Sequence, residues 1–220
     1  MIDGWQRRDS LSFREYQSYV DYVEHQGSKL EQLNLSRYSE TFKKALSERL
    51  GRLPELHAGS SVLCLGARTG AECEAFAALG CFAVGIDLNP GPNNRYVVHG
   101  DFHQLQFSDA SVDVIYTNAL DHTFQFDKVV GEIKRVLKPT GSLIAEIVRG
   151  LQDEAGRAPG AFESTWWDSL EAPIAVICEG GFKLDRRFRF TIPWAGDTCV
   201  FKSKYAGTSL KKKVWRRLLP

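Results

Sequence analysis

The apolar residues of this chain cluster in seven short runs. Segments whose apolar residues have helical spacing lie between the first five of these runs. The runs span residues 62–65, 82–86, 96–98, 112–117, 142–148, 182–192 and 198–204. Short buried runs that alternate with amphipathic helices are typical of a parallel sheet covered on both faces. The connection at 193–197 is too short for a crossover, so the last strand must run antiparallel to the one before it. The pattern predicts a doubly wound, mostly parallel α/β sheet of seven strands with the last strand antiparallel.

The region before the first run has helical spacing instead. Tyr16, Tyr19, Val20 and Val23 share one face of a helix, and the spacing repeats from residue 42 to residue 53. We expect residues 1–54 to form an N-terminal helical cap, 55–205 the core, and 206–220 a basic tail. The cap either packs on the core or covers a cleft, in which case Tyr16, Tyr19 and Tyr22 line a pocket. A further helix is expected over 165–179.

The turn after the first run is the strongest functional signal. Gly66-Ala67-Arg68-Thr69-Gly70 separates the run from a helix-compatible segment at 71–79, an arrangement that brings backbone amides up to a ligand. The second run ends in Asp87, 21 residues after Gly66, which is about one β-α-β unit. A carboxylate at this position can accept hydrogen bonds from both hydroxyls of a ribose. We therefore expect a nucleoside ligand.

Composition narrows the class of protein without choosing a function. The chain has 220 residues, 43% hydrophobic and 25% charged, as expected for one globular domain. It shows no membrane span and no secretion signal, so we expect a cytoplasmic location. The five cysteines include no CxxC pair and suggest neither a metal site nor a disulfide framework. The net charge is +1, but residues 202–220 carry seven basic residues and no acid, a tail that could meet a phosphate backbone.

Five motifs, in order, resemble those of class I S-adenosylmethionine-dependent methyltransferases of the small "type 11" sort. They are Val62 to Gly70, Gly85-Ile86-Asp87-Leu88-Asn89, Gly100-Asp101-Phe102, Asp113 to His122, and Glu132 to Leu143. The resemblance covers about residues 55–205. It implies a Rossmann-like fold, S-adenosylmethionine as cofactor and S-adenosylhomocysteine as product.

The resemblance also implies roles for individual residues. The turn from Gly66 to Gly70, which includes Ala67, Arg68 and Thr69, would approach the methionine and ribose. Asp87 would hold the ribose hydroxyls and Leu88 would lie against the adenine. Asp101 and the amide of Phe102 would contact the adenine edge, while Asn118 and Ala119 would lie beneath the sulfonium.

Two positions depart from the family pattern. Cys64 stands where the family usually has an acid that orients the methionine amine, and Arg68 stands at the central glycine of the turn. Glycine there normally permits positive φ and a close backbone approach. We hypothesise that Arg68 pairs with the methionine carboxylate; the alternative is an arginine that faces solvent.

Methyl transfer needs a base only when the acceptor must lose a proton. His122 is the first candidate, because it follows the fourth strand at the cleft and imidazole titrates near neutral pH. Asp121 could orient it or contact the acceptor, and His103 is the weaker alternative. No metal is expected.

Several functions remain open at this point. The first is a methyltransferase that acts on oxygen or nitrogen of a small-molecule or glycan acceptor. The second is an RNA methyltransferase whose basic tail contacts phosphates, and the third is a non-catalytic cofactor-binding or partner protein. A nicotinamide dehydrogenase ranks low, because the turn lacks GxGxxG.

Overall fold

The computed structural model describes residues 4–32 and 36–204 and contains the predicted seven-stranded sheet. Its strand order is β5-β4-β3-β6-β7-β10-β9. The strands are β3 (Ser61–Leu65), β4 (Phe82–Asp87), β5 (Val97–His99), β6 (Val112–Thr117), β7 (Leu137–Val148), β9 (Phe182–Phe190) and β10 (Gly196–Ser203).

The direction of each strand agrees with the prediction. β5, β4, β3, β6 and β7 run parallel to one another, whereas β10 is antiparallel to both β7 and β9. The short connection between β9 and β10 allows only this reversal. The doubly wound, mostly parallel architecture is therefore confirmed.

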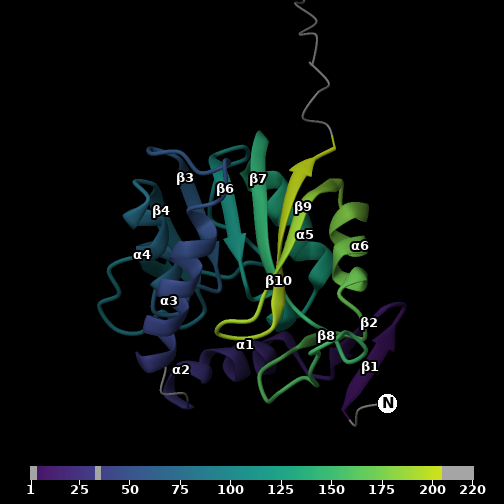
Figure 1. Ribbon diagram of the computed structural model, residues 1–220. Coiled ribbons are helices and arrows are strands. Elements are labelled where there is room, and N and C mark those ends of the chain that lie inside the picture. The colour runs from purple at the N-terminus through teal and green to yellow at the C-terminus, as the bar shows by residue number, and fades with distance from the viewer. Residues whose placement is uncertain (1–3, 33–35, 205–220) are drawn as a thin grey trace, which may run out of the picture.

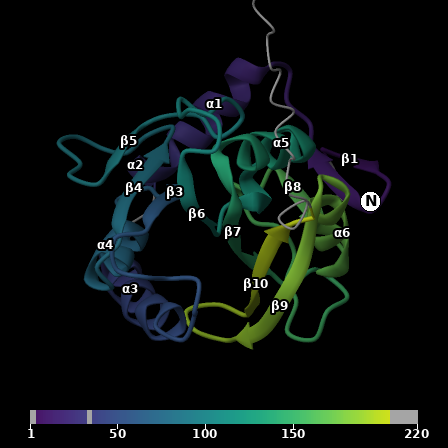
Figure 2. The ribbon, with the colours of Figure 1, turned by 90° about the horizontal axis from the view of Figure 1, so that it is seen from above.

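Helices cover both faces of the sheet (Figures 1 and 2). Side chains alternate along β3, so that Leu63 and Leu65 enter one hydrophobic cluster while Val62 and Cys64 enter the other. The first cluster is completed by α5 (Phe126–Val136) and α6 (Glu171–Glu179), and the second by α3 (Ser36–Leu50) and α4 (Ala71–Ala78).

The N-terminal region and residues 165–167 correct two predictions. Trp5–Arg8 (β1) and Leu11–Arg14 (β2) are strands, so the cap is not wholly helical. Thr165–Trp167 (β8) is also a strand, antiparallel to β2, and the helix expected over 165–179 begins only at Glu171. Thr and Trp favour strands when a pairing edge is available, and here that edge comes from the other end of the chain.

Two short helices complete the cap at the carboxyl ends of the parallel strands (Figure 1). They are α1 (Tyr19–Gly27) and α2 (Lys29–Gln32), which separate at Ser28. The buried face of α1 differs from the predicted one: Val20 is 62% exposed, whereas Tyr22 is fully buried. The hydroxyl of Tyr22 donates to the carbonyl of His122, 3.0 Å away, and so ties α1 to the short 3-10 turn Leu120–His122 that follows β6.

A buried ion pair joins α3 to the centre of the sheet. The Arg49 guanidinium donates from Nε to Glu146 Oε1 at 2.6 Å and from Nη2 to Oε2 at 2.9 Å. Tyr116 and Thr198 donate to the same carboxylate. This network satisfies a charge that would otherwise be buried without a partner.

The remaining expectations concern the cysteines, the membrane and the tail. All five cysteines are free, and four of them are buried. Within the described part of the chain, no helix has the length and apolar character that crossing a membrane requires. The basic tail at 206–220 lies outside the described residues.

Candidate active site

A cavity of about 490 Å³ lies at the carboxyl ends of the parallel strands, within the usual ~300–1,000 Å³ range of ligand pockets. Gly66 follows β3, Asp87 ends β4, and Asn118 follows β6, so three neighbouring strands deliver residues to it. Parallel α/β sheets bind ligands at this edge because the loops after adjacent strands diverge there. Its lining comprises Tyr22, Gln26, Lys29, Leu30, Gly66, Arg68, Asp87, Leu88, Asn89, Phe102, Asn118, Ala119, Asp121, His122, Val148, Arg157, Gly160, Ala161, Phe162, Glu163 and Trp194.

The backbone of the glycine turn leaves no room for a side chain at Gly66. Gly66 has φ +68°, and a Cβ added there would lie 2.6 Å from the Cβ of Ala119. Arg68 also has positive φ, +46°, a backbone region that glycine adopts without strain and that other residues adopt rarely. The turn therefore tolerates the departure at Arg68, and Arg68 lines the cavity.

Asp87 is held in one orientation by backbone amides. Its Oδ2 accepts from the amide of Arg68 and its Oδ1 from the amide of Asn89, both at 2.9 Å. Burial raises the pKa of this carboxyl, while the two amides and the charges of Arg68 and Lys29 act in the opposite direction. Each carboxylate oxygen has a further lone pair for a ligand donor.

The structure brings together most, but not all, of the predicted cofactor residues. Those that line the cavity are Gly66, Arg68, Asp87, Leu88, Phe102, Asn118 and Ala119. Ala67 is buried behind the turn, Thr69 is exposed, and Gly70 caps the start of α4. None of these three lines the cavity, and neither does Asp101.

Asp101 instead anchors α1 to the core. Its Oδ1 accepts from both the amide and Nδ1 of His103 at 2.8 Å, and its Oδ2 accepts from the hydroxyl of Tyr19. The other ring nitrogen of His103, Nε2, accepts from the amide of Phe124 at 3.0 Å. Both nitrogens of His103 are thus engaged and the ring does not line the cavity, which leaves His122 as the histidine that faces it.

His122 is half-buried and has a defined tautomer. Its Nδ1 lies 2.9 Å from the carbonyl of Phe162, which can only accept, so Nδ1 carries the proton. Its Nε2 lies 2.8 Å from Nζ of Lys29 and accepts from that ammonium. Burial and the nearby positive charges of Lys29, Arg68 and Arg157 hold the pKa of His122 well below its usual range.

Asp121 contributes a carboxyl with an unusually high pKa. Burial, reinforced by the charge of Glu163, raises the pKa of Asp121 to about 7. Its Oδ1 lies 3.6 Å from Nε2 of His122 and has no hydrogen-bond partner among the described residues. Arg157 approaches Oδ2 at 3.8 Å and binds Glu163 at 2.7 Å. The two acids and the arginine therefore form one charged cluster beside His122.

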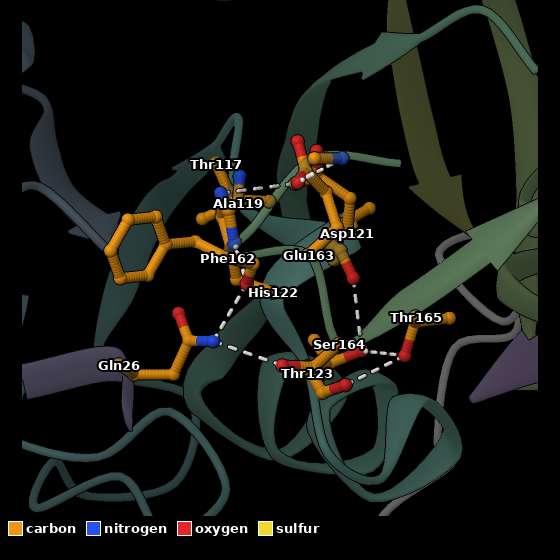
Figure 3. A network of polar contacts seen from close by, with 12 residues as sticks. Gln26, Thr117, Ala119, Asp121, His122, Thr123, Phe162, Glu163, Ser164 and Thr165 are labelled. Carbon is orange, nitrogen blue, oxygen red and sulfur yellow. Dashed lines mark hydrogen bonds and ion pairs between the residues drawn. The ribbon is translucent and has the colours of Figure 1, made fainter. Parts of the chain in front are cut away.

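The loop before β8 carries Glu163 of this cluster, and Gln26 contacts the loop at Phe162 and Ser164 (Figure 3). Nε2 of Gln26, at the end of α1, donates to the carbonyl of Phe162 at 2.7 Å and to Oγ of Ser164 at 2.9 Å. Arg14 of β2 donates to the carbonyl of Glu163 and to that of Gly160, both at 2.8 Å. The cap helices and the small sheet thus hold the segment 160–164, which we call the roof loop.

Some site residues were missed by sequence reasoning. Lys29, Phe162 and Glu163 belong to no motif, and Lys29 reaches the cavity only because the chain breaks at Ser28. Of the three tyrosines considered, only Tyr22 is among the lining residues. Cys64 is fully buried and does not line the cavity, so it takes no part in the pocket that the family acid serves.

Comparisons with known proteins agree with this geometry. Residues 63–145 match the family model described as "Methyltransferase domain". A search of the curated proteins gives no match.

Solved structures match the fold over most of the chain. The Burkholderia thailandensis 1,6-didemethyltoxoflavin-N1-methyltransferase, solved with 1,6-didemethyltoxoflavin and S-adenosylhomocysteine, is 15% identical with a TM-score of 0.67 over 90% of this chain and 98% of that one. A Haloferax volcanii putative methyltransferase, in complex with the Trm112 methyltransferase activator, is 18% identical with a TM-score of 0.61 over 83% and 97%. A SAM-dependent methyltransferase from Aquifex aeolicus is 18% identical with a TM-score of 0.59 over 80% and 97%.

The sequence match, the sheet order and the position of the cavity agree with one another. At these identities the solved structures establish the fold, and the range matched by the family model runs from β3 into β7. Over residues 63–145 the chain therefore matches a methyltransferase domain, and its sheet has the fold of class I S-adenosylmethionine-dependent methyltransferases.

Proposed function

We propose that this enzyme transfers a methyl group from S-adenosylmethionine to an oxygen or nitrogen atom of a small-molecule or glycan acceptor. The observation that carries the proposal is a single cavity in which two sets of residues meet. One set surrounds the glycine turn and Asp87, and the other surrounds His122 and Asp121. A donor and an acceptor held in one cavity can reach the close, in-line geometry that displacement requires.

The cofactor would occupy the side of the cavity formed by the strand ends. Asp87 would accept from the ribose hydroxyls, with Leu88 and Phe102 against the adenine and Asn118 and Ala119 beneath the sulfonium. Ala67, Thr69, Gly70 and Asp101, which do not line the cavity, would act as supports for the turn and for α1.

Arg68 would bind the methionine carboxylate, since it lines the cavity on the turn beside Asp87. An Arg68→Ala variant should then bind S-adenosylmethionine more weakly but bind 5′-methylthioadenosine, which lacks the carboxylate, as the parent does. Equal affinity of the variant and the parent for both compounds, measured by calorimetry, would reject this role.

His122 and Asp121 would accept the proton that the acceptor loses. His122 offers a neutral imidazole, and Asp121 offers a carboxylate oxygen without a protein hydrogen bond among the described residues. A hydroxyl or a protonated nitrogen must lose a proton during methylation, and these are the groups at hand to receive it.

The roof loop supports a small acceptor over RNA. Phe162 and Glu163 lie over the cavity and are held by Gln26 and Arg14, so the pocket is enclosed by several elements. The Burkholderia thailandensis neighbour was solved with both a small molecule, 1,6-didemethyltoxoflavin, and S-adenosylhomocysteine bound. Because the tail at 206–220 is basic and could contact phosphates, RNA is the second candidate acceptor.

Transfer of tritium from S-adenosyl-[methyl-³H]methionine separates the two candidates. The full chain and a chain that lacks residues 206–220 are incubated with a cell extract divided into a small-molecule fraction and an RNA fraction. The proposal predicts label in the small-molecule fraction with both chains. Label in RNA that disappears with the tail would favour the RNA methyltransferase, and cofactor binding without label in any fraction would favour a non-catalytic protein.

A further inference from the structure

The cavity contains a lysine and a histidine in direct contact, and this pair restricts when His122 can act. The carbonyl of Phe162 fixes the proton of His122 on Nδ1, so Nε2 is its one basic atom. That atom already accepts from the ammonium of Lys29 at 2.8 Å. While Lys29 is charged, His122 has no lone pair free for an acceptor.

We propose that Lys29 is a positioning residue that opens and closes the proton-accepting nitrogen of His122, and that the acceptor is a hydroxyl or a protonated nitrogen. The inference rests on the proposed function for the identity of the reaction. To the proposed function the inference adds two points. Lys29 sets the pH range in which the enzyme works, and the acceptor belongs to the class that must lose a proton to a base.

The surroundings of Lys29 allow it to lose its proton near neutral pH. Burial, helped by the charge of Arg68, lowers the pKa of Lys29 to about 8. The other charged or titratable groups that act on the pair are Asp87, Asp121, Glu163, Arg157 and His25. Of these, the three acids oppose the loss of the proton and keep the pKa from falling further.

Lys29 and His122 together account for every proton that the reaction moves. Lys29 first releases one proton to solvent and becomes a neutral amine. Nε2 of His122 then takes the proton of the acceptor as the electron pair of the acceptor bonds to the methyl carbon, and the C–S electron pair stays on sulfur. Nε2–H donates to the neutral Nζ of Lys29 until the methylated product and S-adenosylhomocysteine leave, and the proton then passes to solvent.

Asp121 stabilises the protonated state of His122 in this partly buried position. Its Oδ1 lies 3.6 Å from Nε2 and has no other hydrogen-bond partner among the described residues. A carboxylate at this distance attracts the imidazolium that forms during transfer. The same atom would offer no comparable benefit if His122 stayed neutral throughout.

Nuclear magnetic resonance of ¹⁵N-histidine in the full chain tests the inference without knowledge of the acceptor. The chain has five histidines, and the His122 signals are those missing from a His122→Asn variant. The wild type should show the Nδ1–H tautomer and a step in the Nε2 shift centred near pH 8, where Lys29 titrates.

Three variants complete the experiment. Lys29→Met should abolish the step and raise the pKa of His122, because the neighbouring cation is gone. Lys29→Arg should also lack the step up to pH 10, because arginine keeps its charge. Lys128→Met, on the exposed side of α5, should titrate like the wild type.

Two results would overturn the inference: a step that persists in Lys29→Met, or a wild-type His122 with its proton on Nε2. Should Lys29→Met fail to fold, Lys29→Arg supplies the same comparison, and a step near pH 8 that persists in Asp121→Asn excludes Asp121, whose pKa is about 7, as its source. Binding of S-adenosylmethionine is measured separately by calorimetry, so failure of the proposed function and failure of the role of Lys29 are distinguishable.

Discussion

At the scale of single residues, buried charges dominate this site. The cavity collects Asp87, Asp121 and Lys29, each with its pKa displaced by burial toward the neutral form. Groups of this kind reduce the stability of the empty protein and are typical of functional sites. The sign of each displacement gives a direct test.

Asp121→Asn should stabilise the protein at pH 8. The folded-state pKa of Asp121 is raised from 3.8 to about 7, so the folded protein binds the extra proton between these values and stability falls as the pH rises through that window. Asparagine cannot ionise, so the variant escapes this loss. Scanning fluorimetry should show a higher Tm for the variant at pH 8 and a smaller difference at pH 5.

Asp113→Asn is the matched control with the opposite sign. Lys138 and Ser61 lower the pKa of Asp113 to about 2, so its contribution to stability is present above 3.8 and is lost as the pH falls toward 2. This variant should lower Tm at pH 8. An equal decrease of Tm in both variants at pH 8 would mean that Asp121 is not under electrostatic strain.

At the scale of elements, the small sheet β1–β2–β8 has a function for which no signal was recognised in the sequence. Its β2 strand supplies Arg14, whose guanidinium lies over the Trp5 ring at 4.9 Å and donates to two carbonyls of the roof loop. The sheet therefore positions the loop that closes the cavity.

Arg14→Ala should loosen the roof loop without unfolding the core. Two hydrogen bonds from a charged donor are lost, each worth about 1.5–3 kcal/mol. Hydrogen exchange of the amides at 160–164 should then accelerate by at least about tenfold, the factor that 1.4 kcal/mol of local stability represents. Arg8→Ala, in the same hairpin, removes only contacts to Gln6 and Phe13 and should leave these amides unchanged. Equal exchange rates of these amides in the two variants would show that Arg14 does not hold the roof loop in place.

The contact between α3 and β7 gives a second prediction at this scale. Arg49→Met leaves the fully buried carboxylate of Glu146 without its cation and should cost about 3–5 kcal/mol of unfolding free energy. Adding Glu146→Gln removes that charge and should recover a large part of the loss. Urea denaturation of the two variants measures both values, and a double variant that is less stable than Arg49→Met would contradict the explanation.

At the scale of the whole molecule, the sequence predicts what depends on local order and misses what depends on distant pairing. The position of Asp87 follows from its 21-residue separation from Gly66, and the reversed β10 follows from a short connection. β8 was missed because Trp167 pairs with Leu11, far along the chain, whereas β1 and β2 form a local hairpin whose signal was overlooked. The alternation of Leu11 and Phe13 with polar residues after the Asp9-Ser10 turn was the available signal.

The same division separates the two sides of the site. The cofactor side lies on turns that directly follow predicted strands, so spacing locates Gly66, Asp87 and Asn118. The acceptor side combines Lys29 from the cap with Phe162 and Glu163 from the roof loop. Their meeting depends on how the cap closes on the sheet, which no local pattern encodes.

The central claim is that the ribose of S-adenosylmethionine binds to the carboxylate of Asp87. Isothermal calorimetry with S-adenosylmethionine tests it on the wild type, Asp87→Ala, Asp87→Asn and the control Asp127→Ala, whose side chain is exposed on α5. Loss of hydrogen bonds to a charged acceptor should cost about 2.7 kcal/mol, or roughly 100-fold in Kd, for Asp87→Ala and somewhat less for Asp87→Asn, with no change for the control. A folded Asp87→Ala protein that binds the cofactor with wild-type affinity would contradict the account.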